Sequence, residues 1–297
     1  MEVFRTPEER FEDLPGFPYR PRYRWWRDLR LAHVDEGDPS AAPVVMLHGE
    51  PTWSYLYRKV MAPLLAAGHR CVVPDLPGFG RSDKPTDDAW YSYDNHTAAV
   101  ASPFEELDLT DVTLVGHDWG GPIGLRVATT KMPERVSRFV AMDTRVLTGY
   151  QQMGEGWYAL RDSVQENPDV AVWRLIRGGC KVPPPPEVLS AYEAPFPEEA
   201  SKAGVRAFPP MIPIRPDAPG AATGQAVAEA LAGDTRPTLL LWADSDPVIP
   251  LDPIGRLTQD VFPAADELTV IEDAGHFLQE DQGERIGTLI SAWLDTL

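Results

Sequence analysis

The sequence predicts an α/β fold in which a mostly parallel sheet is flanked by helices and interrupted once by a helical insertion. Two continuous apolar runs, 43–47 and 112–115, have the composition of strands buried on both faces. Stretches with a helical pattern separate them, and further strands are expected at 137–142 and 238–242. Strands that alternate with helices form parallel sheets, because each crossover uses a helix to return the chain.

The first part of the chain supplies the beginning of this sheet. Residues 1–18 are charged and spaced by prolines, which indicates an arm along the surface. Residues 22–36 alternate apolar and polar on both sides of Arg27-Asp28, which predicts a β-hairpin. The other elements expected here are helices over 52–67, 93–107 and 121–131 and a strand over 70–73, with Pro103 expected to bend or interrupt its helix.

The alternation stops between residues 144 and 219. This segment is rich in proline, including Pro183 to Pro186, and proline at such density is incompatible with central sheet. We therefore expect residues 144–219 to form a helical cap over the strand ends, between two parts of one core at 1–143 and 220–297. The elements expected in the second part are helices over 224–232 and 253–261, strands over 238–242 and 267–271, and a final helix from Gln279.

Composition and charge narrow the function classes. The chain has 297 residues, enough for a large catalytic core, and it contains no apolar run near the roughly 18 to 20 residues of a membrane span. The net charge of −18 argues against nucleic acid or an anionic membrane as a partner and disfavours an anionic substrate. Cys71 and Cys180 form no metal or redox spacing, and the first residues lack a signal peptide pattern, so a cytoplasmic protein is expected.

The chain is organised around the stretch from Gly116 to Gly120, which follows a buried strand and precedes a helix. Its glycines flank Asp118 with the spacing of a nucleophile elbow, G-x-S-x-G, with aspartate in the serine position. The elbow lifts this side chain above the sheet, where the backbone N–H groups of a helix N-terminus also point. Asp118 is therefore a candidate covalent nucleophile, and the alternative is a helix N-cap.

An ester on a carboxylate needs a base that activates water, and histidine suits this task at neutral pH. Of the six histidines, His276 lies just past the last predicted strand, which matches the chain order nucleophile, acid, histidine. Asp246, at the end of the preceding strand, is the favoured acid to orient it. Asp143, at the end of the strand before the cap, is a possible alternative acid.

Taken together, these motifs resemble the haloalkane dehalogenases of the α/β-hydrolase fold. The resemblance implies a mostly parallel, eight-stranded sheet with the helical cap inserted after the sixth strand. It points to the subfamily whose acid follows the later strand and whose second halide donor is a cap tryptophan, a position that Trp173 matches. The stretches that carry the resemblance are 48–59, 78–85, 116–121, 194–206 and 273–277.

The resemblance implies hydrolysis of haloalkanes to a primary alcohol, halide and a proton. Asp118 would form an alkyl ester, which water activated by His276 then hydrolyses. Trp119 and Trp173 would bind halide through their indole N–H groups, and the backbone N–H groups of Glu50 and Trp119 would form the oxyanion hole. No cofactor or metal is implied. One departure is Asp143, which stands where an asparagine is expected.

The expected partner is a small neutral halogenated hydrocarbon, bound by a monomer or weak homo-oligomer. Apolar residues of the cap and strand ends are candidates for the substrate pocket: Phe208, Pro209, Ile212, Val248 and Ile249.

Rival functions require other residues. An epoxide hydrolase would use the same triad with cap tyrosines as proton donors, and the candidates are Tyr150, Tyr158 and Tyr192. A haloacetate dehalogenase would carry arginines after the nucleophile, where this chain has Trp119-Gly120. A non-catalytic small-molecule binder is the third alternative, and such a protein has no need of an intact nucleophile, base and acid.

Overall fold

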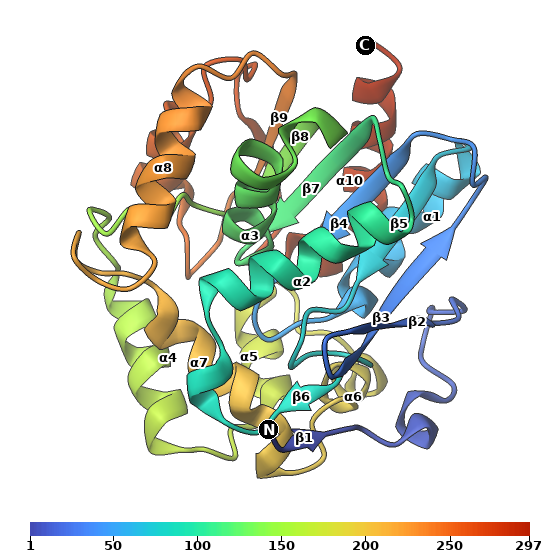
Figure 1. Cartoon of the computed structure of the whole chain (residues 1–297), viewed down its shortest axis with the longest axis vertical. Helices are drawn as coiled ribbons and strands as arrows, with labels where there is room; N and C mark the ends of the chain where they lie inside the picture. Colours follow the sequence, from blue (N-terminus) through green and yellow to red (C-terminus); the bar gives the residue numbers. More distant parts are fainter.

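The computed structural model describes residues 1–297 and contains an eight-stranded sheet in the order β10-β9-β8-β7-β4-β5-β3-β2 (Figure 1). The strands β10, β9, β8, β7, β4 and β5 pair in parallel in this order. The hairpin β2–β3 adds to the sheet beside β5, where β3 runs antiparallel to β5. This confirms the predicted α/β fold and the hairpin. The strands are β2 (Arg22–Trp26), β3 (Leu29–Glu36), β4 (Pro43–Leu47), β5 (Arg70–Pro74), β7 (Val112–His117), β8 (Val136–Met142), β9 (Thr238–Ala243) and β10 (Thr269–Ile271).

The centre of the sheet is formed by β4 and β7, in which every residue is buried. Their side chains are mainly Val, Leu and Met, which fit a strand that is covered on both faces. The register pairs Leu47 with Gly116, so the two strands end side by side. The turns that follow β4 and β7 are therefore neighbours at the carboxyl edge of the sheet, where ligands bind in open α/β folds.

Helices cover both faces of the sheet. Figure 1 shows α2 and α3 in front of it and α1 and α10 behind it. Helix α1 packs on α10, while α2 and α8 both pack on α3. The core helices are α1 (Arg58–Ala66), α2 (Tyr93–Glu106), α3 (Gly120–Arg126), α8 (Ala221–Ala232), α9 (Arg256–Gln259) and α10 (Leu278–Leu294).

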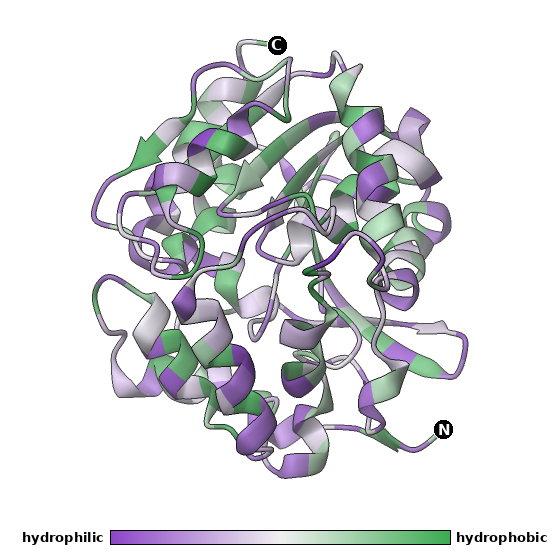
Figure 2. Ribbon diagram, turned by 90° about the vertical axis from the view of Figure 1, so that its left-hand side faces the viewer, coloured by the Kyte–Doolittle hydropathy of each residue, from purple (hydrophilic) through white to green (hydrophobic).

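Four α-helices and one 3₁₀ turn, Glu199–Lys202, but no strand, lie in the segment between β8 and α8. They gather beyond the carboxyl ends of the central strands, in the lower part of Figures 1 and 2. They are α4 (Glu155–Glu166), α5 (Val172–Gly179), α6 (Pro186–Glu193) and α7 (Ala203–Met211). A separate two-stranded sheet pairs β1 (Val3–Phe4) with β6 (Lys84–Pro85). No helix anywhere in the chain is long and apolar enough to cross a membrane.

Several predicted helices are divided in the structure. The one expected over 52–67 is a 3₁₀ turn, Ser54–Tyr57, followed by α1, and those over 121–131 and 253–261 each contain a π-helical turn. Periodicity alone does not separate α-helix from these tighter or wider turns, because the apolar side chains still fall on one face.

Pro103 was expected to bend or interrupt its helix, and the interruption is wrong, because α2 continues through it. A proline inside a helix leaves the carbonyl four residues earlier, here that of Ala99, without its usual donor. In this structure the Ser102 hydroxyl and the Arg24 guanidinium both donate to the Ala99 oxygen, at 3.0 and 3.2 Å. These substitute donors explain why the helix continues to Glu106.

A buried ion pair ties the cap to the core. Arg58 on α1 and Glu280 on α10 form a two-fold hydrogen-bonded pair at 2.6 and 2.8 Å, and their side chains are 4% and 5% exposed. Tyr192 on α6 donates its hydroxyl to the same carboxylate at 2.8 Å. Because Glu280 lies four residues after His276, this cluster also fixes the helix that follows the candidate base.

We expect Glu280→Gln to lower the free energy of unfolding by about 3 to 5 kcal/mol, because it leaves the Arg58 charge buried without its counterion. Urea unfolding followed by circular dichroism measures this change. The control is Asp217→Asn, which removes an ion pair with Arg215 whose side chains are 73% and 79% exposed and should cost less than about 0.5 kcal/mol. Equal losses in the two variants would contradict the role given to Glu280.

Candidate active site

Asp118 stands on a sharp turn between β7 and α3, with a φ of 48° that non-glycine residues rarely adopt. The glycines around it are required by close packing. A Cβ on Gly116 would lie 2.7 Å from the Cα of Gly121, and one on Gly120 would collide with the carbonyl of Leu47. The turn has the tight backbone geometry that the glycine spacing predicts for a nucleophile elbow.

The backbone after β4 holds one oxygen of this carboxylate. The N–H of Glu50 donates to Asp118 Oδ1 at 2.9 Å, and the N–H of Trp119 also donates to the Asp118 carboxylate. Gly49 lets the chain pass this closely, since a Cβ there would overlap the Asp118 carboxylate. The other oxygen, Oδ2, lies 3.8 Å from His276 Nε2. Burial raises the pKa of Asp118, and His276 and the two N–H groups oppose that rise.

His276 is oriented by Asp246. Its Nδ1 lies 2.8 Å from Asp246 Oδ2, while Asp246 Oδ1 accepts the N–H groups of Val248 and Ile249 at 2.6 and 2.9 Å. Burial acts to raise the pKa of Asp246, but the neighbouring His276 and these hydrogen bonds lower it below its usual value. Burial likewise acts to lower the pKa of His276, and Asp246 and Asp118 overcome this and raise it above 6.5. The structure thus brings Asp118, His276 and Asp246 together.

Asp143 also lies beside this histidine, at the end of β8. Its Oδ1 accepts the N–H of Ala243 at 2.9 Å, whereas its buried Oδ2 has no partner among fixed donors. One atom from each of Asp143, Asp246 and His276 lies within 4.8 Å of the others, a spacing that a metal ion could also use. The imidazole nitrogen that faces Asp246 is, however, already engaged in a hydrogen bond. Burial and the adjacent Asp246 raise the pKa of Asp143 well above its usual value.

Two further titratable side chains adjoin the nucleophile. Burial, and then the nearby Asp118, raise the pKa of the Glu50 carboxyl well above its usual value, which favours the uncharged form of this side chain. Burial and the neighbouring His276 lower the pKa of His117 to about 3. The Nε2 of His117 lies 2.8 Å from the carbonyl oxygen of His276, so His117 supports the backbone of the base and is not itself placed for proton transfer.

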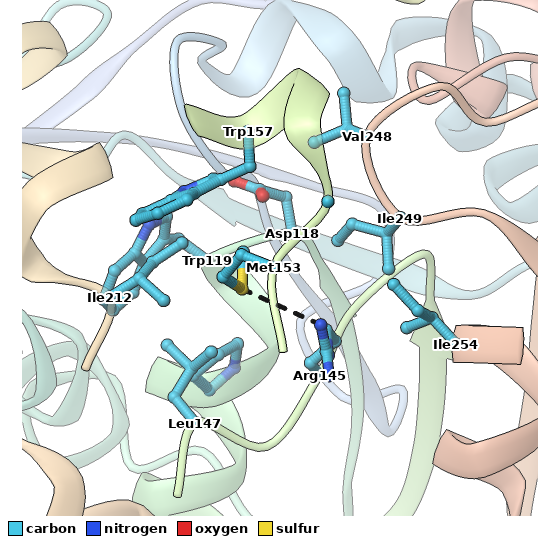
Figure 3. A pocket seen from close by; sticks show the side chains of 12 residues that line it. Asp118, Trp119, Arg145, Leu147, Met153, Trp157, Ile212, Val248, Ile249 and Ile254 are labelled. Carbon is cyan, nitrogen blue, oxygen red and sulfur yellow. Dashed lines mark hydrogen bonds between the residues drawn. The ribbon is translucent and has the colours of Figure 1, made fainter. Parts of the chain in front are cut away.

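Two tryptophans face the cavity above Asp118. They are Trp119, which follows the nucleophile, and Trp157 on α4, and Figure 3 shows both rings beside the carboxylate. The indole N–H of Trp157 is buried and has no acceptor within the protein. Phe208 packs edge-on against Trp119, with ring centroids 5.3 Å apart, and so supports that indole from behind.

The structure does not bring Trp173 to this cavity. Trp173 lies on α5 in a separate surface cleft with Arg177 and Leu189, and its backbone N–H donates to Glu193 at 2.7 Å. Trp157 was missed by the sequence analysis. The spacing of Trp157 and Val164 by two helical turns could have indicated that both lie on the buried face of one helix, as they do in α4.

The cavity is narrow, with a volume of about 50 Å³, and is mostly apolar. Of the expected pocket residues, Ile212, Val248 and Ile249 line it, whereas Phe208 and Pro209 lie buried in α7 outside its lining. Its other lining residues are Asp118, Trp119, Pro122, Arg145, Leu147, Met153, Gly154, Trp157 and Ile254.

None of the three tyrosines considered for an epoxide hydrolase lines the cavity. Tyr150 is 72% exposed and Tyr158 is 39% exposed, while Tyr192 is committed to Glu280. Without a hydroxyl donor above Asp118, the site lacks the group that would protonate an epoxide oxygen. Indole N–H groups stand there instead, and these bind an anion without giving up a proton.

Known proteins share this sequence and architecture. Residues 42–173 match the model of the alpha/beta hydrolase fold family. A haloalkane dehalogenase of Psychrobacter cryohalolentis is 42% identical, over 98% of this chain and 97% of that protein, and one of Mycobacterium marinum is 39% identical, over 99% and 100%. Among solved structures, the tetrameric haloalkane dehalogenase DpaA from Paraglaciecola agarilytica is 34% identical and superimposes with a TM-score of 0.90 over 97% of each chain. This chain therefore belongs to the haloalkane dehalogenases, α/β-hydrolase enzymes that cleave carbon–halogen bonds.

Proposed function

We propose that the enzyme works through a covalent alkyl ester on Asp118. The observation that carries this proposal is the unequal placement of the two carboxylate oxygens. The N–H of Glu50 holds Oδ1 and the N–H of Trp119 also donates to the carboxylate, while Oδ2 lies 3.8 Å from His276 Nε2 and Asp118 lines the cavity. Oδ2 attacks the carbon that bears the halogen, and a C–O bond forms as the carbon–halogen bond breaks and halide leaves with its electron pair.

Hydrolysis of the ester uses the same two donors. His276 Nε2 takes a proton from water, and the resulting hydroxide adds to the carboxyl carbon of Asp118. The negative charge then develops on Oδ1, which already accepts the N–H of Glu50, and the N–H of Trp119 donates to the same carboxyl group. A preformed donor of this kind is worth about 10²- to 10³-fold in rate. Collapse of the intermediate breaks the bond between the carboxyl carbon and Oδ2, and the departing alkoxide takes the proton from His276 to become the alcohol. The new carboxyl group, which keeps the oxygen of water, then loses its proton to solvent.

Asp246 is the acid that orients the base in this proposal, and Asp143 is a neutral neighbour. Two adjacent buried carboxylates do not both ionise, and Asp246 has the stronger stabilisation because it accepts two N–H groups and the imidazole. The proton on Asp143 then serves as a donor toward Asp246. Protonated aspartic acid here supplies one hydrogen-bond donor and no charge, as the expected asparagine would.

The halide site consists of Trp119 and Trp157, and Trp157 replaces Trp173 in the role first assigned by resemblance. Each indole offers a donor and no acceptor, which suits a leaving anion. The N–H of Trp157 lacks a partner in the protein, so a halide would complete its hydrogen bonding. The apolar walls formed by Ile212, Val248 and Ile249 would contact the alkyl chain.

Bromide release from 1-bromobutane and 1,2-dibromoethane tests the reaction. We expect release by the native enzyme and none above background by Asp118→Ala. We also expect His276→Phe to accumulate the ester, because the first step needs no base, and mass spectrometry should show the alkyl group on the peptide that contains Asp118. Turnover of an epoxide without bromide release, or hydrolysis at the native rate in His276→Phe, would contradict the mechanism.

The tryptophan assignment is tested by bromide titration followed by intrinsic fluorescence. Trp157→Phe should weaken bromide binding by about 10-fold or more, since it removes a desolvated hydrogen bond to an anion. Trp173→Phe is the matched control and should leave binding unchanged, because Trp173 lies in another cleft. The reverse pattern would restore the original assignment.

The two acids are separated by their effects on the pH profile of ester hydrolysis. His276 must be neutral to act as a base, so hydrolysis declines as the pH falls through its raised pKa, above 6.5. Asp246→Asn removes the largest cause that raises this pKa, so the decline should move to lower pH, with a rate loss of about 10²- to 10⁴-fold. Asp143→Asn should leave the profile in place, because it exchanges one neutral donor for another.

Single-turnover measurements of ester breakdown from pH 5 to 9 give both profiles. A downward shift in Asp143→Asn as large as that in Asp246→Asn would show that Asp143 is ionised, and the acid assignment would then be wrong.

A further inference from the structure

One charged residue lines the otherwise apolar wall of the cavity. Arg145 lies just after β8 and is partly buried. Only its Nη1 is engaged, by the carbonyl oxygen of Gln152 at 3.1 Å and by Met153 Sδ at 3.8 Å (Figure 3). Its Nε and Nη2 make no hydrogen bond within the protein, although a guanidinium offers five N–H donors in a planar fork. Most of the hydrogen-bonding capacity of Arg145 is therefore unused.

No carboxylate of the protein neutralises this guanidinium. Arg145 takes part in no ion pair, and burial is the only cause that shifts its pKa, which it lowers. Asp118 therefore does not act as its counterion, even though both residues line the same cavity. A partly desolvated cation without a partner is unfavourable, so the site favours any ligand that brings a negative charge to it.

Arg145 and the two tryptophans lie at different ends of the cavity. In Figure 3, Arg145 lies across Met153 from the indole of Trp157. The carbon–halogen bond must lie at Asp118, beside the two tryptophans, and the chain of the substrate extends along apolar side chains. The residues nearby, such as Leu147 and Ile254, offer no hydrogen-bond acceptor. A substrate that carries an acceptor could therefore replace water at the free Nε and Nη2 of Arg145.

We propose that Arg145 selects haloalkanes that carry a carboxylate at the end remote from the halogen. This inference rests on the proposed function, because the halogenated carbon must lie at Asp118. A carboxylate matches the guanidinium fork with two parallel hydrogen bonds, which a methyl terminus cannot form. The overall charge of −18 disfavours anionic substrates, and Arg145 supplies a local field of the opposite sign at the cavity.

The preferred substrates are distinct from haloacetates. In a haloacetate the carboxylate is attached directly to the carbon under attack, and an arginine beside the nucleophile would have to hold it. Trp119 occupies that place, and Arg145 instead reaches the cavity from the end of β8. A spacer of methylene groups between halogen and carboxylate is therefore expected, and its length reports the span from Asp118 to the guanidinium.

The experiment compares bromide release from bromoacetate, 4-bromobutanoate and 6-bromohexanoate with release from 1-bromoalkanes of equal length and from the methyl esters. We expect the native enzyme to prefer one of the longer acids over its alkane. Arg145→Met should lower the acid-to-alkane ratio of kcat/KM by about 10- to 100-fold, the range for a lost hydrogen bond to a charged group. The loss should appear mainly in KM, since the contact is remote from the reacting atoms.

Arg177→Met is the matched control, because Arg177 is an exposed arginine in the Trp173 cleft and should not change the ratio. Equal losses for acids and alkanes in Arg145→Met would show a merely structural role and overturn the proposal, as would a native enzyme without preference for any acid. A preference for the methyl ester equal to that for the acid would also overturn it in favour of neutral oxygen acceptors. Failure of the proposed function is recognised separately, by absence of bromide release from every alkane.

Discussion

The site depends on one hydrogen bond between two turns, the N–H of Glu50 donating to Oδ1 of Asp118. It makes the two oxygens of the nucleophile different, so that one is held and the other is free. The bond forms because β4 and β7 are adjacent and end in register, and because Gly49 leaves room for the carboxylate. The left-handed backbone of Asp118 supplies the remaining constraint, since it turns the side chain back toward the end of β4. Sheet register therefore determines catalytic geometry.

The site residues at strand ends could be predicted because a parallel sheet fixes where the residues that follow its strands lie. Asp118, Asp246 and His276 each follow an apolar run that is recognisable in the sequence, and parallel strands bring their carboxyl ends to one edge. Chain order then distinguished the acid and the base from other candidates. The backbone N–H groups of Glu50 and Trp119 were predicted from the resemblance to haloalkane dehalogenases. The protonation of Asp143 could not be read from sequence, because it depends on burial and on the distance to Asp246.

Residues contributed by the cap were harder to predict. Trp157 and Trp173 both lie on amphipathic cap helices, and nothing in a helical pattern says which helix faces the cavity. Strand pairing does not fix the position of α4 relative to α5. That position depends on tertiary packing, which the sequence pattern does not reveal. Phe208 shows the same limit: it was expected to line the substrate pocket, but it packs against Trp119 and does not line the cavity. Pro103 failed as a helix breaker because Arg24 and Ser102, one of them distant in sequence, satisfy the carbonyl it frees.

The distribution of charge explains how so many ionisable groups occupy one small site. Four carboxyl groups lie at or near the nucleophile, and their burial favours the neutral form of each. Asp246 is stabilised as a carboxylate by His276, and Asp118 is stabilised by His276 and two N–H groups. Glu50 has no such partner, and Asp143 has the N–H of Ala243 but no cation beside it. In the site without substrate, the negative charge is therefore favoured on Asp118 and Asp246, whose hydrogen bonds are already formed. Arg145 is the opposite case, because it is a cation in the same cavity and no carboxylate of the protein pairs with it. In the proposal above, a substrate carboxylate supplies the missing negative charge.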